Sequence, residues 1–169
     1  NDPCGDLDPE LTKQVNFEAT KNLVKLSKSK GVERFIFASS SSVYGIKQEL
    51  NVTEDLELEP LTIYSKTKAE AENIILQEAT QDFAAVCIRS ATVCGYSPRQ
   101  RLDLVVNIFA SSALTKGEIM VNGGEQKRPN IHIDEITDLY LNLLSVPIEK
   151  ISGQIFNYGG ENHTLMELA

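Results

Sequence analysis

The chain has 169 residues, of which 41% are hydrophobic and 24% are charged, and its formal net charge is −8. A globular chain of this length can bury a sizeable core, but the acidic balance disfavours a nucleic-acid partner, because phosphate binding requires clustered lysine and arginine. No apolar run reaches the roughly 20 residues of a membrane span, so we expect no membrane partner.

Cysteine and histidine usage narrows the class further. The three cysteines are Cys4, Cys87 and Cys94, and no C-x-x-C pair occurs. An odd number without close spacing favours reduced thiols, and no signal peptide is visible, so we expect a cytoplasmic protein. His132 and His163 are the only histidines and lie far apart in the sequence. Without a Cys/His cluster, we expect no metal site.

The first half of the chain predicts helices and strands in alternation. In chain order we expect a helix at 10–30, a strand at 34–38, a loop at 45–60, a helix at 63–80 and a buried strand at 83–89. Asp8 is a suitable N-cap for the first helix, and Gly31 supplies its C-terminal stop. Apolar periodicity and turn residues carry these assignments.

The second half continues the alternation. We expect a loop at 95–101, a helix at 102–116, a strand at 118–121, a Gly123-Gly124 turn, a helix at 134–145 with Asp134 as N-cap, and a strand at 154–158. Thr164 and Glu167 have the spacing of a capping box, so another helix begins there. Such alternation implies an α/β fold with a parallel sheet covered on both faces, in which ligands bind beyond the carboxyl ends of strands.

Tyr64 and Lys68 stand four residues apart at the start of the predicted helix 63–80, and a serine run at 39–42 lies upstream. Residues at this spacing share a helix face, and a nearby positive charge lowers the pKa of a phenol from its usual value of about 10. Alone, the Tyr64/Lys68 pair is more typical of a partly exposed tyrosine beside a solvated lysine, and the serine run is more typical of a loop. Together they provide the hydroxyl, phenol and ammonium that move a proton while a nicotinamide carries a hydride.

The same residues resemble the extended short-chain dehydrogenase/reductase family, in its NAD-dependent epimerase/dehydratase branch acting on nucleotide sugars. The matching segments, in chain order, are 8–20, 35–45, 64–72, 89–95 and 128–134. The resemblance implies a Rossmann-like doubly wound parallel sheet and part of a smaller C-terminal substrate-binding region. It divides the chain into residues 1–95, with the catalytic groups of the NAD(P)-binding domain, and 96–169, with substrate-binding elements and a returning Rossmann strand.

One family feature is missing from this sequence. The glycine-rich pattern that binds the dinucleotide pyrophosphate does not occur. We therefore expect the chain to be the interior of a longer protein, truncated at both ends, with weak or absent dinucleotide affinity of its own. The group that selects NAD or NADP follows the second strand of such folds. NAD is the expected cofactor by resemblance, and NADP stays open.

The resemblance also implies roles for individual residues. Tyr64 is the general acid/base, Lys68 lowers its pKa and binds the nicotinamide ribose, and the catalytic hydroxyl is Ser40, four residues before Tyr44. The neighbouring Ser39 is expected to bind the cofactor, and Ser41, like Ser40, to contact the substrate. Ala91 matches a position that touches the cofactor through its backbone, Thr92 one that contacts substrate phosphates, and Arg128 one that contacts the substrate diphosphate. A guanidinium suits that task because it grips phosphate with two hydrogen bonds, although Arg128 alone would equally suit a surface position.

The reaction type is left with alternatives. Dehydratases of the family place an Asp-Glu pair after the catalytic hydroxyl, where this chain has Ser41 and Ser42, which disfavours elimination. We favour a nucleotide-sugar epimerase over a reductase of a keto-sugar nucleotide. A dinucleotide-binding sensor without turnover is a third reading, which Ser40, Tyr64 and Lys68 argue against. By resemblance, the full-length protein is expected to be a homodimer through helices 10–30 and 63–80.

Overall fold

The structure is a computed structural model that describes residues 5–49 and 51–169, so Cys4 lies outside the described residues. The chain divides into two units. Unit 1 comprises the residues up to Arg89 together with Tyr140–Asn157, and unit 2 comprises Ser90–Leu139 together with Tyr158–Ala169. The expected domain boundary at residue 95 stays a prediction. Each unit is described by itself.

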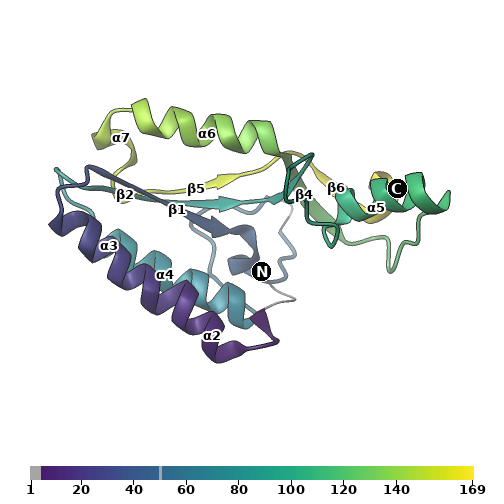
Figure 1. Cartoon of the computed structure of the whole chain (residues 1–169), viewed down its shortest axis with the longest axis horizontal. Helices are drawn as coiled ribbons and strands as arrows, with labels where there is room; N and C mark the ends of the chain where they lie inside the picture. The colour runs from purple at the N-terminus through teal and green to yellow at the C-terminus, as the bar shows by residue number, and fades with distance from the viewer. Residues whose placement is uncertain (1–4, 50) are drawn as a thin grey trace. The chain divides into compact units, whose positions relative to one another are not determined.

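Unit 1 is built on a three-stranded sheet whose strand order is β1-β2-β5. The strands are β1 (Arg34–Ser40), β2 (Ala84–Ser90) and β5 (Ile155–Tyr158), and their arrows point the same way in Figure 1. Helices α3 (Ala19–Ser29) and α4 (Ile63–Glu78) cover one face, while residues 140–145 of α6 (Ile133–Ser145) and α7 (Ile148–Ile151) cover the other. This confirms the predicted α/β fold with a parallel sheet.

The core of unit 1 lies between the sheet and the pair α3 and α4. Strand β2 is buried along Ala84–Arg89, as expected for a strand covered on both faces. Its Cys87 packs in one cluster with Phe37 of β1 and Ile75 of α4. The Lys28 ammonium joins the two helices through the Glu78 carboxylate at 3.0 Å.

The first predicted helix has the expected limits but not a continuous α-helical form. Asp8 caps its start, where the Leu11 amide donates to the Asp8 carboxylate at 3.0 Å, and Gly31 adopts a φ of 74° after its end. Between them, α2 (Pro9–Lys13) and α3 are joined by a π-helix, η1 (Gln14–Glu18). The wider turn of a π-helix shifts the register of the side chains that follow. The apolar side chains that remain more than half exposed are Leu11, Val15, Leu23 and Leu26.

Strand β1 runs two residues further than predicted, through Ser40. The 3₁₀ helix η2 (Ser41–Tyr44) follows at once and ends at Gly45. The φ of Gly45 is 72°, and a Cβ there would overlap the carbonyl oxygen of Glu59. Only glycine meets both conditions without strain. The loop after the serines is thereby held against residues near the start of α4.

Unit 2 contains a second three-stranded sheet with the order β3-β4-β6. Strand β3 (Thr92–Cys94) runs parallel to β4 (Lys127–His132), and β4 runs antiparallel to β6 (Asn162–Thr164). The unit also holds α5 (Val105–Lys116) and α8 (Leu165–Leu168). The capping box at Thr164 is confirmed, since the Glu167 amide donates to the Thr164 hydroxyl at 3.1 Å.

Two predictions in unit 2 were wrong. No strand forms at 118–121, where Met120 is 78% exposed. Residues 127–132 form the strand that pairs with β3 instead, so β3 does not provide a hydrogen-bonding partner for residues 118–121. Helix α6 begins at Ile133, which places Asp134 inside the first turn and not at the N-cap.

Candidate active site

Tyr64 and Lys68 lie in the first turns of α4, which contacts both β1 and η2. Thr62 and Ser65 form a capping box at its start, with the Ser65 amide donating to the Thr62 hydroxyl at 3.1 Å. The Lys68 Nζ lies 5.8 Å from the centroid of the Tyr64 ring. The predicted pair therefore shares one helix face, as its spacing indicates.

The Lys68 ammonium also contacts strand β1. It donates a hydrogen bond of 2.8 Å to the carbonyl oxygen of Ala38, two residues before Ser40, and lies 4.5 Å from the centroid of the Phe37 ring. An ammonium has three N–H donors, and the Ala38 carbonyl takes one of them. This arrangement fits a cofactor ribose, whose hydroxyls accept hydrogen bonds, beside the Tyr64 phenol.

The electrostatics of Lys68 are set by burial. Burial lowers the pKa of Lys68, because the charged ammonium loses hydration, and the carboxylate of Glu72 opposes this shift. Burial raises the pKa of the neighbouring Cys87 thiol well above its usual range, so Cys87 is neutral at physiological pH. Glu72 is thus the nearby anion that favours the charged form of Lys68.

Ser40 occupies the junction between β1 and η2. Its hydroxyl oxygen accepts hydrogen bonds from the Ser42 amide at 3.2 Å and from the Ser42 hydroxyl at 3.0 Å. A hydroxyl has two acceptor positions and one proton to donate. Because Ser42 fills both acceptor positions, the Ser40 hydroxyl keeps its proton for donation to another oxygen.

Ser39 points to a different partner. Its side chain is 4% exposed, and its hydroxyl donates to the Glu72 carboxylate at 2.5 Å. Side chains of consecutive strand residues point to opposite faces, which separates the environment of Ser39 from that of Ser40. The predicted contact of Ser39 with a cofactor stays a prediction, as does the predicted substrate contact of Ser41 in η2.

A buried ion pair that sequence reasoning missed lies behind the serines. The Arg89 guanidinium donates to the Glu72 carboxylate at 2.7 Å through Nη2 and at 3.0 Å through Nε. Both side chains are at most 3% exposed. Burial would lower the pKa of Arg89, but its hydrogen bonds to Glu72 and Tyr44 outweigh burial and raise it. The sequence did contain a sign of this pair, because Arg89 directly follows the apolar run 84–88. A charged residue next to a buried strand requires a partner of opposite charge.

The network continues from Arg89 into the loop before α4. Arg89 donates to the Tyr44 phenol at 2.7 Å, and Tyr44 donates to the Asn157 side chain at 2.7 Å. Glu54 accepts from Arg89 through its carbonyl at 3.2 Å and from the Asn157 amide through its carboxylate at 2.7 Å. The network thereby joins strands β1, β2 and β5 of unit 1 to the loop before α4.

The remaining predicted residues belong to unit 2. Ala91 is 6% exposed, and its amide donates to the Tyr158 carbonyl at 2.8 Å. A Cβ on Gly159 would lie 2.7 Å from the Ala91 side chain, so both positions require small residues. Thr92 pairs with Asn130 across β3 and β4. Arg128 is exposed on β4, opposite His163 of β6.

The structure thus groups the predicted residues by unit. Within unit 1, Ser40 ends the strand whose Ala38 carbonyl binds Lys68, and Lys68 lies beside Tyr64. The predicted residues of unit 2 are Ala91, Thr92 and Arg128. In the described part of the chain, no group of three or more His, Cys, Asp or Glu side chains is placed to hold a metal ion. No helix within that same part is both long enough and apolar enough to cross a bilayer.

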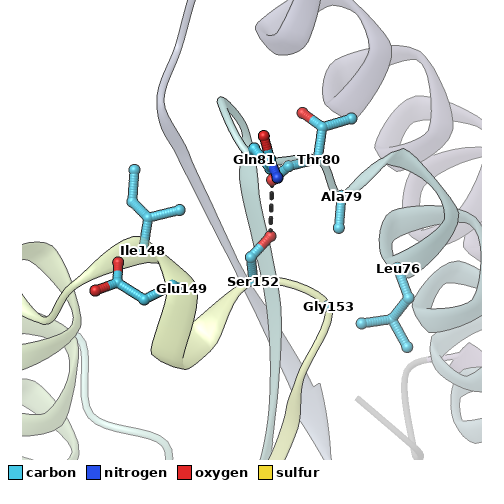
Figure 2. A pocket seen from close by; sticks show the side chains of 8 residues that line it. All are labelled: Leu76, Ala79, Thr80, Gln81, Ile148, Glu149, Ser152 and Gly153. Carbon is cyan, nitrogen blue, oxygen red and sulfur yellow. Dashed lines mark hydrogen bonds between the residues drawn. The ribbon is translucent and has the colours of Figure 1, made fainter.

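An open cavity of about 640 Å³ lies elsewhere in unit 1, and Figure 2 shows the residues that line it. It lies at the end of α4 and beside α7, where the Ser152 hydroxyl donates to the Thr80 carbonyl at 3.1 Å. Strand β2 begins near this cavity, at Ala84, whereas ligands of open α/β sheets bind beyond the strands' carboxyl ends. The cavity is therefore separate from the candidate active site.

Known proteins resemble this chain in both sequence and fold. The sequence model of the NAD dependent epimerase/dehydratase family matches residues 5–159. The chain is 31% identical over 147 residues to an uncharacterized UDP-glucose epimerase, YtcB, of Bacillus subtilis (strain 168), and the match covers 86% of this chain and 45% of that protein.

Two solved structures are similar as well. MoeE5 in complex with UDP-glucose and NAD has a TM-score of 0.77 and 31% identity, covering 90% of this chain and 51% of that one. The UDP-N-acetylglucosamine 4-epimerase from Methanobrevibacter ruminantium M1, in complex with UDP-N-acetylmuramic acid, has a TM-score of 0.84 and 27% identity, covering 99% of this chain and 55% of that one. The chain spans about half the length of these relatives. It belongs to the NAD dependent epimerase/dehydratase family.

Proposed function

We propose that the full-length protein is an NAD-dependent nucleotide-sugar epimerase in which Ser40, Tyr64 and Lys68 carry the proton transfer. The observation that carries this proposal is the position of the Lys68 ammonium, between the Tyr64 ring at 5.8 Å and the Ala38 carbonyl at 2.8 Å. A cation beside a phenol favours the phenolate, which is the basic form. Similarity to a UDP-glucose epimerase and to a UDP-N-acetylglucosamine 4-epimerase supports the reaction class.

In this proposal the side chains divide the work. NAD, when bound, would supply the acceptor and donor of the hydride at the sugar carbon, and Lys68 would hold its ribose. Tyr64, as phenolate, takes the proton of the sugar hydroxyl while the carbon becomes a ketone, and it gives the same proton back when the ketone is reduced from its other face. Ser40 donates a hydrogen bond to the reacting oxygen, since Ser42 already fills its acceptor positions. Lys68 stabilises the phenolate and binds the cofactor ribose.

Unit 2 is proposed to bind the nucleotide part of the substrate. Arg128 is exposed on β4 and presents a guanidinium that can bind a diphosphate with paired hydrogen bonds. Thr92 and the backbone at Ala91 are proposed to contact substrate phosphates and cofactor, respectively. The two residues after Ser40 are Ser41 and Ser42, and not an acidic pair that could remove water from a keto-sugar. We therefore do not propose water elimination.

A homodimer is proposed through the helices α2, η1, α3 and α4. Leu11, Val15, Leu23 and Leu26 lie on the first three of these and are 53–57% exposed. An exposed apolar stripe on a helix is typical of a protein contact. Sedimentation of the full-length protein tests this, with a monomer as the result that would contradict it.

An absorbance spectrum of the purified full-length protein tests the proposed reaction. With candidate nucleotide sugars, an epimerase shows a nicotinamide that is reduced only transiently, with no net consumption of cofactor. Stoichiometric oxidation of added NADH or NADPH by a keto-sugar nucleotide would show a reductase instead. Cofactor binding without turnover of any nucleotide sugar would favour a sensor.

A further inference from the structure

The Glu72 carboxylate is the most buried charged group near the candidate active site, with 1% of the residue exposed. Glu72 follows Lys68 by four residues and Tyr64 by eight on α4. At this spacing the three side chains share one helix face. Glu72 is too deeply buried to contact a substrate, so its contacts with neighbouring residues decide what it does.

One contact of Glu72 leads to the strand that carries Ser40. Ser39 donates its hydroxyl to the Glu72 carboxylate at 2.5 Å, and the Ser39 side chain is buried. Ser39 and Ser40 share a peptide bond, and their side chains point to opposite faces of β1. Holding the Ser39 side chain against α4 therefore limits how the backbone of Ser40 can rotate or shift.

A second contact leads to the residues that follow Ser40. Glu72 binds Arg89 through both carboxylate oxygens, at 3.0 and 2.7 Å. Arg89 in turn donates to the phenol of Tyr44 at 2.7 Å, and Tyr44 is the last residue of η2. The ion pair therefore holds the segment around Ser40 on both sides, through Ser39 before it and through Tyr44 after it.

We propose that Glu72 is a positioning residue, which through Ser39 and Arg89 holds Ser40 at a set distance from the helix face of Tyr64 and Lys68. The inference rests on the proposed function, because it assigns Glu72 to the geometry of that reaction. A buried ion pair by itself contributes little net stability, since desolvation offsets the attraction. Catalytic groups, by contrast, lose rate steeply when they are displaced. We therefore expect Glu72 to matter more for the position of Ser40 than for the free energy of unfolding.

A double-mutant cycle in the full-length protein tests the link between Ser39 and Ser40. We expect Ser39→Ala to lower kcat about tenfold, with KM within about twofold, because it removes a hydrogen bond to a carboxylate. In a Ser40→Ala background the same change lowers the residual rate no further, since Ser39 acts through Ser40. Ser29→Ala, at an exposed position on α3, is the matched control and leaves kcat unchanged. An equal loss in both backgrounds, or no loss in either, would overturn the proposal.

A second variant separates position from stability. Replacing the pair by Glu72→Met together with Arg89→Met keeps a buried side chain of similar size at both positions, and such replacements often retain the fold. We expect this double variant to keep cooperative unfolding and yet to lose kcat about tenfold or more. A folded double variant with unchanged kcat would overturn the assignment of Glu72.

Amide hydrogen exchange provides a readout that does not require turnover. The Ser42 amide donates to the Ser40 hydroxyl at 3.2 Å, so its exchange rate reports whether Ser40 stays in place. We expect faster exchange at Ser42 in Ser39→Ala and no change in Ser29→Ala. Unchanged exchange in Ser39→Ala would overturn the positioning role. If Ser40→Ala leaves turnover intact, the proposed reaction fails, and this exchange measurement still decides whether Ser39 holds Ser40.

Discussion

The Lys68 ammonium and the Ala38 carbonyl are joined by a hydrogen bond of 2.8 Å, which ties α4 to β1 two residues before Ser40. The partner atom is a backbone oxygen, so its position is set by the strand and not by a rotatable side chain. Lys68 is thereby held beside the Tyr64 ring even though both residues are only partly buried. This hydrogen bond therefore links Tyr64 and Lys68 on α4 to the strand that ends in Ser40, which are the two parts of the proposed proton-transfer site.

The first prediction concerns the phenol. Tyr64→Phe in the full-length protein is expected to lower kcat by about 10²–10⁴, because it removes the group that exchanges the proton. The affinity for NAD, measured by calorimetry, is expected to stay within a few-fold, since the ring remains. Tyr96→Phe is the matched control, because Tyr96 is 81% exposed in unit 2. A Tyr64→Phe enzyme with near-normal kcat would assign the proton transfer to another residue.

A second prediction concerns Lys68 and pH. Burial lowers the pKa of Lys68 in the folded state, so the charged ammonium is less favourable folded than unfolded. The resulting cost to stability is present at low pH and is relieved as pH rises through the lowered pKa. Relative to Lys68→Met, the unmodified protein should therefore gain stability from neutral to alkaline pH. Urea unfolding of both proteins across that range measures the difference, and a relative loss of stability would contradict it.

The buried ion pair supports a third prediction. Arg89→Met alone leaves the Glu72 carboxylate buried without its cationic partner, and we expect a loss of about 3–5 kcal/mol in the free energy of unfolding. Combining it with Glu72→Met should recover much of that loss, because no uncompensated charge remains. Urea unfolding of the two variants and the unmodified protein gives the comparison. Equal destabilisation in both variants would show that packing, and not the unpaired charge, causes the loss.

Two glycines with nearly the same φ allow a fourth prediction. Gly31→Ala meets no atom within 4 Å and imposes only the strain of a positive φ, 74°, which costs about 1–2 kcal/mol. Gly45→Ala has a similar φ of 72°, but the ψ of Gly45 is −138°, outside the left-handed helical region and unfavourable for any residue with a Cβ, and the added Cβ would also overlap the Glu59 carbonyl. We expect the Gly45 variant to be the less stable of the two and to lose kcat as η2 shifts. Similar unfolding midpoints for the two variants would mean that the backbone at Gly45 and the loop at Glu59 both yield without cost.

Several features of the site follow from residues close together in the sequence. The spacing of Tyr64 and Lys68 places them on one helix face, because helical periodicity is local. The apolar run 84–88 indicates a strand buried on both faces, and the capping residues near Asp8 and Thr164 are confirmed for the same local reason. From such features the α/β class and the family could be predicted.

Tertiary structure alone decided the partners of the buried charges and the pairing of the second sheet. Arg89 meets Glu72 and Tyr44, which lie 17 and 45 residues away, so no local pattern specifies the network that joins them. Residues 127–132, and not 118–121, pair with β3, because a strand requires a neighbour for its backbone hydrogen bonds. Local periodicity determines which residues share a face, whereas long-range packing determines what that face meets.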